Sequence, residues 1–379
     1  MLHMIGSLDP AHGGPPQAVR QIARAYQQIG VGVEVACLDE AGADFLRGAD
    51  FPVHALGPGR AGFDFSWRVG GWLRGNAGRF DALVMHGLWS WPGLAVRAAA
   101  HVAGKPYGIF PHGALDPWFN RQYPLKRLKK KAFWPLQYPV LRDARYVFFT
   151  SDAERDLAAT SFHPNRWSSL VVPYGASEPA GEPAAQVEAW LARCPAVGRR
   201  SYLLFLGRLH EKKGCDLLLR AFAAVAGAAA DLDLVMAGPD QVGWQATLQQ
   251  MAENIGVSAR VHWPGMLTGD AKWGALRAAE AFVLPSHQEN FGIAVAESLA
   301  VGRPVLISNQ VNIWPEVESE GVGLVDEDTL EGTERLLRRW LELPAEERDA
   351  MADRCHPCYL RRYSPVRTAQ ELGNAFAQK

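Results

Sequence analysis

The sequence predicts an α/β fold of two doubly wound, parallel-sheet domains that face each other across a cleft. The chain has 379 residues, which is long for a single hydrophobic core. Short apolar runs alternate with amphipathic segments in two successive sets, separated by a Gly-, Pro-, Ser- and Glu-containing stretch at 175–183. We expect a first domain at 1–176, a second at 177–361, and a last helix at about 362–379 that packs back on the first.

Composition excludes several classes of protein. Apolar residues make up 48% and charged residues 21%, as in ordinary soluble enzymes, and the net charge of −1 argues against a nucleic-acid partner. The start of the chain lacks the pattern of a signal peptide, and the most apolar run, at 221–230, is too short to span a bilayer. Five cysteines, an odd number, favour a reducing, cytoplasmic location.

The first set of elements begins with a strand at 3–8 and a helix that ends at Gly30, followed by a strand at 33–38. Gly13 and Gly14 lie between the first strand and the helix, where they let a backbone approach a ligand. The alternative is a plain tight turn, and the pair alone does not decide between them.

Further strands are expected at 81–85, 107–110 and 146–150. His86 and Trp89 follow the first of these, and His112 and Asp116 follow the second. Because strand ends of one parallel sheet share an edge, the two histidines could share a cleft, and His86, Trp89 and Asp116 are candidates for its acceptor side. A structural role remains the alternative for each histidine taken singly.

Residues 124–138 combine cations with apolar side chains. The cations are Lys126, Arg127, Lys129, Lys130 and Lys131, interleaved with leucines and aromatic residues. On a helix this pattern is typical of a segment that lies on an anionic membrane surface. It equally fits a solvated helix whose apolar side packs into the domain, and the sequence leaves both interpretations open.

The second set predicts strands at 202–206, 232–237, 260–263, 281–285, 304–308 and 323–325. The tail from Glu331 reads as three or four helices, with breaks at Pro344, Pro357 and Pro365. Asp231 and Asp233 have the Asp-x-Asp form of a metal site, but they lie before a buried strand, so we expect a structural role and no metal. A structural role is also expected for the Cys-His-Pro-Cys run at 355–358, which lacks a second ligand pair.

Residues 281–308 predict a strand, a loop, a helix and a second strand, with Glu289 in the loop and Glu297 in the helix. Arg208 and Lys213 follow the strand at 202–206, where two cations facing Gly13 and Gly14 would cradle a diphosphate. The carboxylates suit hydroxyl groups. A ligand with both features is a nucleoside diphosphate sugar.

These motifs resemble the retaining glycosyltransferases of family four, which have the GT-B fold. The resemblance rests on Gly207-Arg208, Lys213-Gly214 and the run from Glu289 to Glu297, together with the Gly-Gly loop at 13–14, the Pro-His-Gly segment at 111–113 and the turn at 302–305. The segment at 110–118 is similar to the branch that builds bacterial exopolysaccharide, capsule or lipopolysaccharide.

The resemblance implies roles for the donor site. Gly14 would allow backbone approach to the diphosphate, Arg208 and Lys213 would neutralise it, and Glu297 would hold the ribose. The donor sugar would be held by Glu289 and by the backbone of Asn290, Phe291 and Gly292, with His112 near the anomeric carbon. The nucleotide base would lie near the backbone of Gly265 and Met266. No side-chain nucleophile, cofactor or metal is expected.

The resemblance also implies the partners: a UDP- or GDP-sugar donor and a glycan or polyprenyl-linked glycan acceptor. The expected location is cytoplasmic, with a peripheral position at the inner face of the plasma membrane as a further expectation. Two alternatives remain at this point, a non-catalytic nucleotide-sugar-binding protein and an epimerase or phosphorylase on the same fold.

Overall fold

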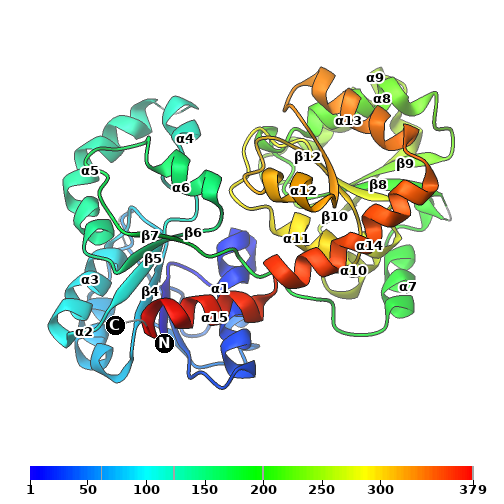
Figure 1. Cartoon of the computed structure of the whole chain (residues 1–379). Helices are drawn as coiled ribbons and strands as arrows, with labels where there is room; N and C mark the ends of the chain where they lie inside the picture. The colour runs from blue at the N-terminus through cyan, green and yellow to red at the C-terminus, as the bar shows by residue number, and fades with distance from the viewer. Residues whose placement is uncertain (61, 123, 199, 378–379) are drawn as a thin grey trace. The chain divides into compact units, whose positions relative to one another are not determined.

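The computed structural model describes residues 1–60, 62–122, 124–198 and 200–377, and it divides into two compact units (Figure 1). The first unit joins Met1–Gly175 to the segment that begins at Ser364, and the second is Ala176–Tyr363. Each unit has its own sheet and core.

The sheet of the first unit is parallel throughout, in the order β3-β2-β1-β4-β5-β6-β7. Its strands are β1 (Leu2–Ile5), β2 (Glu34–Cys37), β3 (Val53–Ala55), β4 (Leu83–His86), β5 (Tyr107–Phe110), β6 (Tyr146–Phe149) and β7 (Ser169–Val171). Its helices are α1 (Gly14–Gln28), α2 (Trp67–Asn76), α3 (Trp91–Ala103), α4 (Pro117–Gln122), α5 (Pro124–Arg142), α6 (Asp152–Ala158) and α15 (Pro365–Ala377).

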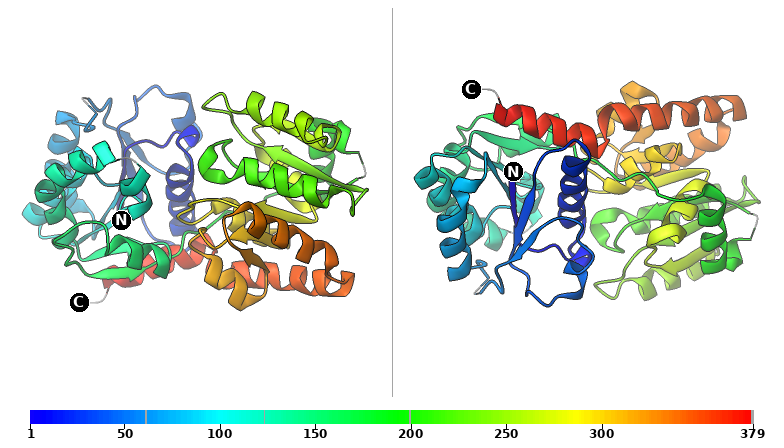
Figure 2. Two further views of the ribbon diagram at one scale, coloured as in Figure 1. Left: turned by 90° about the horizontal axis from the view of Figure 1, so that it is seen from above. Right: turned by 90° about the horizontal axis from the view of Figure 1, so that it is seen from below.

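Helices cover both faces of this sheet. Met4, Met85 and Ile109 alternate with their strand neighbours and share a core with side chains of α2 and α3. On the opposite face α15 lies beside α1 (Figure 2), and Phe376 of α15 meets Phe148 of β6 edge-on, with ring centroids 5.8 Å apart. The last helix of the chain therefore belongs to the first unit.

The second unit repeats the design with six parallel strands in the order β10-β9-β8-β11-β12-β13. The strands are β8 (Ser201–Leu206), β9 (Leu232–Ala237), β10 (Val261–Gly265), β11 (Ala281–Leu284), β12 (Val305–Ser308) and β13 (Gly323–Asp326). The helices are α7 (Pro183–Arg193), α8 (Cys215–Ala226), α9 (Gln245–Asn254), α10 (Gly269–Ala278), α11 (Ile293–Ala300), α12 (Trp314–Glu320), α13 (Leu330–Glu342) and α14 (Ala345–Arg362).

In both sheets the first strand lies in the middle. The order in which later strands are added reverses beside it, between β1 and β4 in one unit and between β8 and β11 in the other. In open parallel sheets the loops at the carboxyl ends of such strands form the ligand site. The predicted pair of doubly wound domains is confirmed. None of the helices among the described residues has both the length and the apolar character that crossing a bilayer requires.

Two local predictions are wrong. Pro357 does not end a helix but lies inside α14, because the loss of one backbone hydrogen bond is offset by burial of Met351, Cys355 and Tyr359 on the same helix. The short edge strand β3 was missed, since its three residues, Val-His-Ala, are only half-buried and show no clear apolar pattern.

Candidate functional site

The carboxyl ends of β8, β9 and β10 are held together through glycine backbone. Gly207 N donates to Ala237 O at 2.9 Å, and Gly238 N donates to Gly265 O at 2.9 Å. A Cβ at position 238 would lie 1.7 Å from the carbonyl oxygen of Gly207, so only glycine fits there. This edge therefore presents backbone groups, including those of Gly265 from the predicted base site.

The loop after β8 packs directly on the loop after β11. Gly214 has φ +66°, and a Cβ there would lie 2.1 Å from the carbonyl oxygen of Pro285. On the same side, Lys212 O accepts hydrogen bonds from His287 N and from Ser286 Oγ, each at 2.9 Å. The two loops are thus locked together at the point where the sheet order reverses.

This packing brings Lys213 into contact with Glu289. Both were predicted as site residues, and they come from loops 76 residues apart in the sequence. Both side chains are largely buried, with 14% and 18% of their surface exposed. Burial, together with the charges of Lys212 and Arg208, lowers the pKa of the Lys213 ammonium to about 7. The Glu289 carboxylate acts in the opposite direction, since it favours the charged lysine.

Glu289 is fixed through its backbone. Its N–H donates to Gln310 O and its carbonyl accepts from Asn312 N, both at 3.0 Å, so the loop pairs with the segment after β12. Three residues later Gly292, with φ +79°, caps the start of α11 in the left-handed conformation that glycine adopts readily. The loop therefore delivers Asn290, Phe291 and Gly292 to a helix start.

Glu297, on α11, is almost fully buried and forms an ion pair with Lys272 of α10 at 2.7 Å. The Lys272 ammonium also lies over the ring of Trp273, 4.3 Å from its centroid. Lys272 was not predicted, because nothing in its own segment links α10 to α11. It supplies the positive charge that a buried carboxylate needs.

Arg208 and Met266 lie at the exposed margin of this edge. Arg208 is exposed, and its guanidinium lies 3.5 Å from Gln241 Oε1. Met266, after β10, is 52% exposed, whereas Gly265 is partly buried. The second unit thus brings Lys213, Glu289 and the start of α11 together, with Arg208 on the same loop as Lys213.

In the first unit, Gly13 and Gly14 lie at the start of α1. Gly13 has φ +92°, outside the range that other residues adopt easily, and Gly14 is the first residue of the helix. Pro15 and Pro16 contribute no N–H group to the first turn. Any anion bound at this helix start would therefore rely on few backbone donors, Gly14 among them.

His112 occupies a strained turn after β5. It is one of the few described residues other than glycine with positive φ, at +54°. The turn is held by Glu154 of α6, which accepts from Gly113 N at 2.7 Å and from the Thr150 backbone N–H and hydroxyl at 2.7 and 2.8 Å. Such a conformation persists only where the surroundings enforce it, which is common at functional sites.

His86 is buried beside His112, with its Nδ1 3.1 Å from His112 Nε2. Trp89 packs against Trp134 and donates from Nε1 to Ala114 O at 3.2 Å. Asp116 is buried and accepts from Trp118 N at 2.8 Å, at the start of α4. The structure thus brings His86 and His112 together, while Trp89 and Asp116 contribute to the packing of the neighbouring loop and helix.

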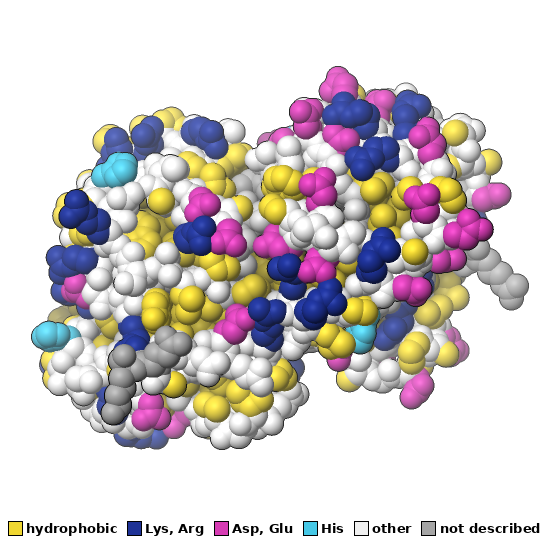
Figure 3. All heavy atoms as spheres, viewed as in Figure 1, with side chains coloured by type: hydrophobic (Ala, Val, Ile, Leu, Met, Phe, Trp, Pro, Cys, Tyr) yellow, Lys and Arg dark blue, Asp and Glu magenta, His cyan; other side chains and the backbone are white. Residues whose placement is uncertain are grey.

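Helix α5 carries the predicted basic segment, and its outward face is apolar. Leu125, Leu128, Phe133 and Leu136 are 79%, 67%, 47% and 45% exposed. Lys126, Arg127, Lys129 and Lys131 are exposed around them, and Lys and Arg side chains gather over this part of the first unit with hydrophobic ones among them (Figure 3). Lys130 differs: its ammonium turns inward, 5.2 Å from the centre of the Trp89 ring.

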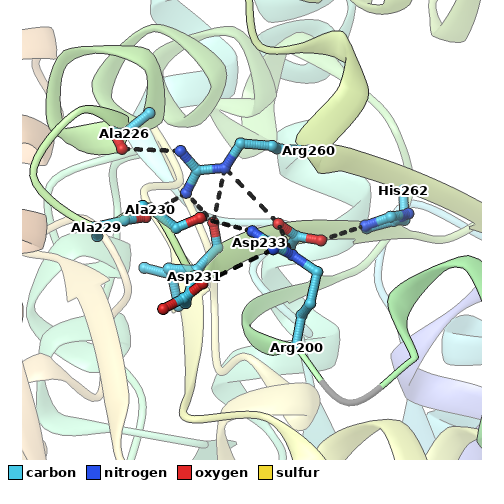
Figure 4. A network of polar contacts seen from close by, with 9 residues as sticks. Arg200, Ala226, Ala229, Ala230, Asp231, Asp233, Arg260 and His262 are labelled. Carbon is cyan, nitrogen blue, oxygen red and sulfur yellow. Dashed lines mark hydrogen bonds and ion pairs between the residues drawn. The ribbon is translucent and has the colours of Figure 1, made fainter.

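The Asp-x-Asp pair lies at the amino end of β9, whereas Lys213 follows the carboxyl end of the neighbouring strand β8. Figure 4 shows the polar contacts around the pair. Asp233 is buried and bonded to Arg200 at 2.9 Å and His262 at 2.7 Å, and Arg260 is 3.7 Å away. Its oxygens are thus occupied by protein donors. Among the described residues, no group of three or more His, Cys, Asp or Glu side chains is arranged to hold a metal ion.

The cysteines of the Cys-His-Pro-Cys run are buried in α14. Burial raises the pKa of Cys355 to about 12 and that of Cys358 to about 11. Thiolates are therefore disfavoured at both positions, which suits a packing role.

Two family models match the chain along most of its length. Residues 187–355 match "Glycosyl transferases group 1", and residues 13–175 match "Glycosyl transferase 4-like domain". The first match contains the Lys213 and Glu289 loops, and the second contains the His112 turn.

Curated relatives are similar over parts of the chain. The D-inositol 3-phosphate glycosyltransferase of Salinispora tropica is 30% identical over 209 residues, covering 53% of this chain and 43% of the relative. The chain thus spans less than half the length of that protein. The GDP-mannose:cellobiosyl-diphosphopolyprenol alpha-mannosyltransferase of Xanthomonas campestris is 25% identical over 317 residues, covering 82% of this chain and 78% of the relative.

Solved structures share the fold along the whole chain. Anabaena Alr3699/HepE in complex with UDP-glucose gives a TM-score of 0.77 at 16% identity, covering 100% of this chain and 99% of that chain. WaaG, described as a glycosyltransferase involved in lipopolysaccharide biosynthesis, gives 0.70 at 15% identity, with both chains covered completely. At these identities the likeness establishes the two-domain fold alone.

Proposed function

Because the chain belongs to the group 1 glycosyltransferases, we propose that it transfers a sugar, with retention and without a metal, from a nucleoside diphosphate sugar to a hydroxyl group. The acceptor is a glycan or a polyprenyl-linked glycan used in cell-surface polysaccharide synthesis. The name of the Xanthomonas campestris relative, with its GDP-mannose donor and cellobiosyl-diphosphopolyprenol acceptor, supports this class of substrates.

The observation that carries the proposal is the contact between Lys213 and Glu289 at the edge where the sheet order reverses. A donor has its negative charge and its hydroxyl groups next to each other, where the sugar joins the β-phosphate. A cation suits the phosphate, and a carboxylate in contact with that cation suits the adjacent sugar hydroxyls. The second unit therefore offers both partners side by side.

In the proposed reaction, the bond between the anomeric carbon and the β-phosphate oxygen breaks, and the acceptor oxygen bonds to the same face of that carbon. The acceptor's proton passes to the departing phosphate oxygen, so the nucleoside diphosphate leaves and no side-chain nucleophile takes part. Lys213 and Arg208 stabilise the charge that develops on the phosphate. Glu289 orients the sugar, and Glu297 holds the ribose.

Sugar transfer is tested with a panel of UDP-, GDP- and ADP-sugars and a lipid-linked glycan acceptor. Wild-type protein should release nucleoside diphosphate and form product, and Lys213→Ala or Glu289→Ala should reduce turnover at least 100-fold while remaining folded. Lys212→Ala removes a neighbouring cation and serves as the matched control. Near-normal turnover in either site variant would overturn the assignment.

Metal independence is tested in the same assay. Turnover should survive EDTA. Complete loss of turnover that a divalent ion restores would contradict the proposal and would require a metal at the donor phosphates.

We further propose that the outward face of α5 lies on an anionic membrane surface at the cytoplasmic side. Helix α5 packs Trp134, Val140 and Leu141 into the domain, but Leu125, Leu128 and Leu136 remain exposed on its outward side. Cations flank these leucines, as in helices that lie in a membrane interface. A lipid-linked acceptor would be presented at such a surface.

Membrane binding is tested with vesicles of phosphatidylcholine with and without phosphatidylglycerol. Each cation near an anionic surface contributes about 1 kcal/mol, so replacing Lys126, Lys129 and Lys131 with Gln should lower binding about 100-fold. Leu125→Ser should weaken binding as well, whereas Val102→Ser, a 77% exposed residue on α3, should not. Equal vesicle binding by all these variants would contradict the proposal.

A further inference from the structure

Three histidines of the first unit form one hydrogen-bonded chain. His3 Nδ1 lies 2.8 Å from His86 Nε2, and His86 Nδ1 lies 3.1 Å from His112 Nε2. The His86 ring stacks on both partners, with centroids 5.1 and 5.2 Å apart. The chain runs from the middle of the sheet, on β1, through the end of β4 to the turn after β5.

The register of the sheet explains this alignment. His3 pairs with Val84 on β4, and Ile5 pairs with His86, which in turn pairs with Phe110. Partners in a parallel ladder share a face, so His3, His86 and Phe110 all project to one side of the sheet. The positive φ of His112 brings its ring, two residues beyond Phe110, onto the same stack, where it lies 5.7 Å from Phe110 at an interplanar angle of 6°.

Both ends of this histidine chain carry an unsatisfied ring nitrogen. His3 Nε2 and His112 Nδ1 are buried and have no hydrogen-bond partner among the residues that the structure describes. Burial lowers the pKa of His3 and of His112 to about 3, and that of His86 well below its ordinary value, so all three rings are neutral. A neutral imidazole carries one N–H and one bare nitrogen.

Only two arrangements of the protons satisfy both hydrogen bonds between the rings. In the outward arrangement, His3 donates to His86, His86 donates to His112, and His112 carries its proton on Nδ1. In the inward arrangement every bond reverses, His112 carries its proton on Nε2, and an unpaired N–H is left at His3 Nε2. The Tyr174 hydroxyl, 3.2 Å from His112 Nε2, can donate in the first case or accept in the second.

The position of the unpaired N–H distinguishes the two. In the inward arrangement it lies on His3, which is 1% exposed within the sheet and packs beside the ring of Tyr26. In the outward arrangement it lies on His112, a partly exposed residue in the turn at the carboxyl edge of the sheet, the edge at which sheets of this type bind ligands. Each arrangement leaves one N–H without a partner in the protein, and such groups are rare unless a ligand or a water molecule supplies an acceptor. We infer that the histidine chain runs outward, and that His86 is the positioning residue that holds His112 as the Nδ1–H tautomer.

The chemical consequence is that His112 Nδ1 donates a hydrogen bond and cannot accept one. The atom it recognises is therefore an acceptor oxygen, such as a sugar hydroxyl, a ring oxygen or a phosphate oxygen. A general-base role for this nitrogen is excluded, since its lone pair is used by the proton. The relevance of the tautomer to sugar transfer rests on the proposed function, but the tautomer itself does not.

The tautomer is measured on the whole protein labelled with ¹⁵N-histidine. Two-dimensional spectra separate a protonated ring nitrogen from a bare one, and the His112 signals are assigned by their loss in His112→Gln. We expect a protonated Nδ1 and a bare Nε2 that stay unchanged from pH 6 to pH 8. A protonated Nε2 on His112 in the wild-type protein would overturn the inference.

Substitution of the middle residue tests the positioning role. His86→Phe keeps a ring in the stack but removes both hydrogen bonds, so His112 should lose its single tautomer and show signals of both. His3→Phe leaves the bond from His86 to His112 intact and should preserve the wild-type tautomer. His54→Phe, a histidine of the same unit outside the chain, is the matched control. An unchanged His112 signal in folded His86→Phe would contradict the inference; if that variant does not fold, the wild-type spectrum alone decides.

A kinetic readout then connects the tautomer to the proposed reaction. Sugar transfer by His86→Phe should fall about tenfold in kcat, the effect of one lost hydrogen bond in the transition state. Absence of transfer in the wild-type protein would remove the proposed function and leave the tautomer result standing. A scrambled tautomer with unchanged transfer would show that the positioning has no catalytic role.

Discussion

Gly214→Ala tests whether the packing of the two loops of the second unit creates the donor site. Gly214 has φ +66° and ψ +29°, and a Cβ there would lie 2.1 Å from the carbonyl oxygen of Pro285. Gly104, at the end of α3, has nearly the same conformation, φ +64° and ψ +29°, with open space where a Cβ would be. Gly104→Ala is therefore a matched control that introduces the same backbone strain without the clash.

The expected magnitudes separate strain from clash. An alanine in the left-handed conformation destabilises each variant by about 1–2 kcal/mol. At Gly214 the new methyl group must also move away by about 1 Å, and a misplacement of that size lowers a rate about 100-fold. Lys213, the preceding residue, would move with it and lose its contact with Glu289.

The assay measures the free energy of unfolding by urea denaturation and the turnover of the sugar donor for both variants. Both variants should lose a similar amount of stability from the backbone strain, and Gly214→Ala should lose more because of the clash. Only Gly214→Ala should lose donor turnover, by about 100-fold. Equal turnover in the two variants would refute the reasoning, because the position of Lys213 would then not matter for the reaction.

Three further predictions concern the charged groups of the two units. Because the pKa of Lys213 is lowered to about 7, the charged form that binds a diphosphate is lost as the pH rises. The donor Kd should therefore increase by up to about tenfold per pH unit above 7. Lys213→Arg should flatten this dependence, and a Kd of the wild-type protein that does not change with pH would contradict the prediction. Lys272→Met leaves the Glu297 carboxylate buried without its cation, so chemical denaturation should show a free energy of unfolding that is lower by about 3–5 kcal/mol. The double variant Lys272→Met, Glu297→Gln should recover part of this loss. An unchanged free energy of unfolding in Lys272→Met would mean that water reaches the carboxylate. Glu154→Ala leaves Gly113 N and two Thr150 donors unsatisfied, and thermal unfolding should show a loss of at least about 3 kcal/mol, with a small change indicating that the turn is held elsewhere.

The sequence was sufficient to predict elements whose local signals agree with their environment. The predicted bounds of β5 and β9 match the structure, because each is a short apolar run between clear turn residues. Ser151, which follows the predicted strand at 146–150, caps α6 with its side chain accepting from Glu154 N, as serine commonly does at a helix start. The helix break predicted at Pro357 is wrong, because the burial of apolar side chains of α14 outweighs the loss of one backbone hydrogen bond.

Contacts between distant segments of the site were beyond the sequence. Lys213 and Glu289 were each predicted as site residues, but their contact depends on Gly214 fitting against Pro285, which no pattern encodes. Lys272 and His3 carry no motif of their own, and only the pairing of α10 with α11 and of β1 with β4 gives them partners. His3 had one weak signal, a histidine in a strand that is otherwise apolar.

The central claim is that Lys213 binds the diphosphate of the donor and Glu289 binds its sugar. It is tested most directly by calorimetric titration with three ligands: a nucleoside monophosphate, the diphosphate and the diphosphate sugar. In wild-type protein each added group should tighten binding. Lys213→Met should selectively reduce the gain from monophosphate to diphosphate, and Glu289→Gln should selectively reduce the gain from diphosphate to diphosphate sugar, because each removes one partner of that group. Full gains in both variants would contradict the assignment of the donor to this site.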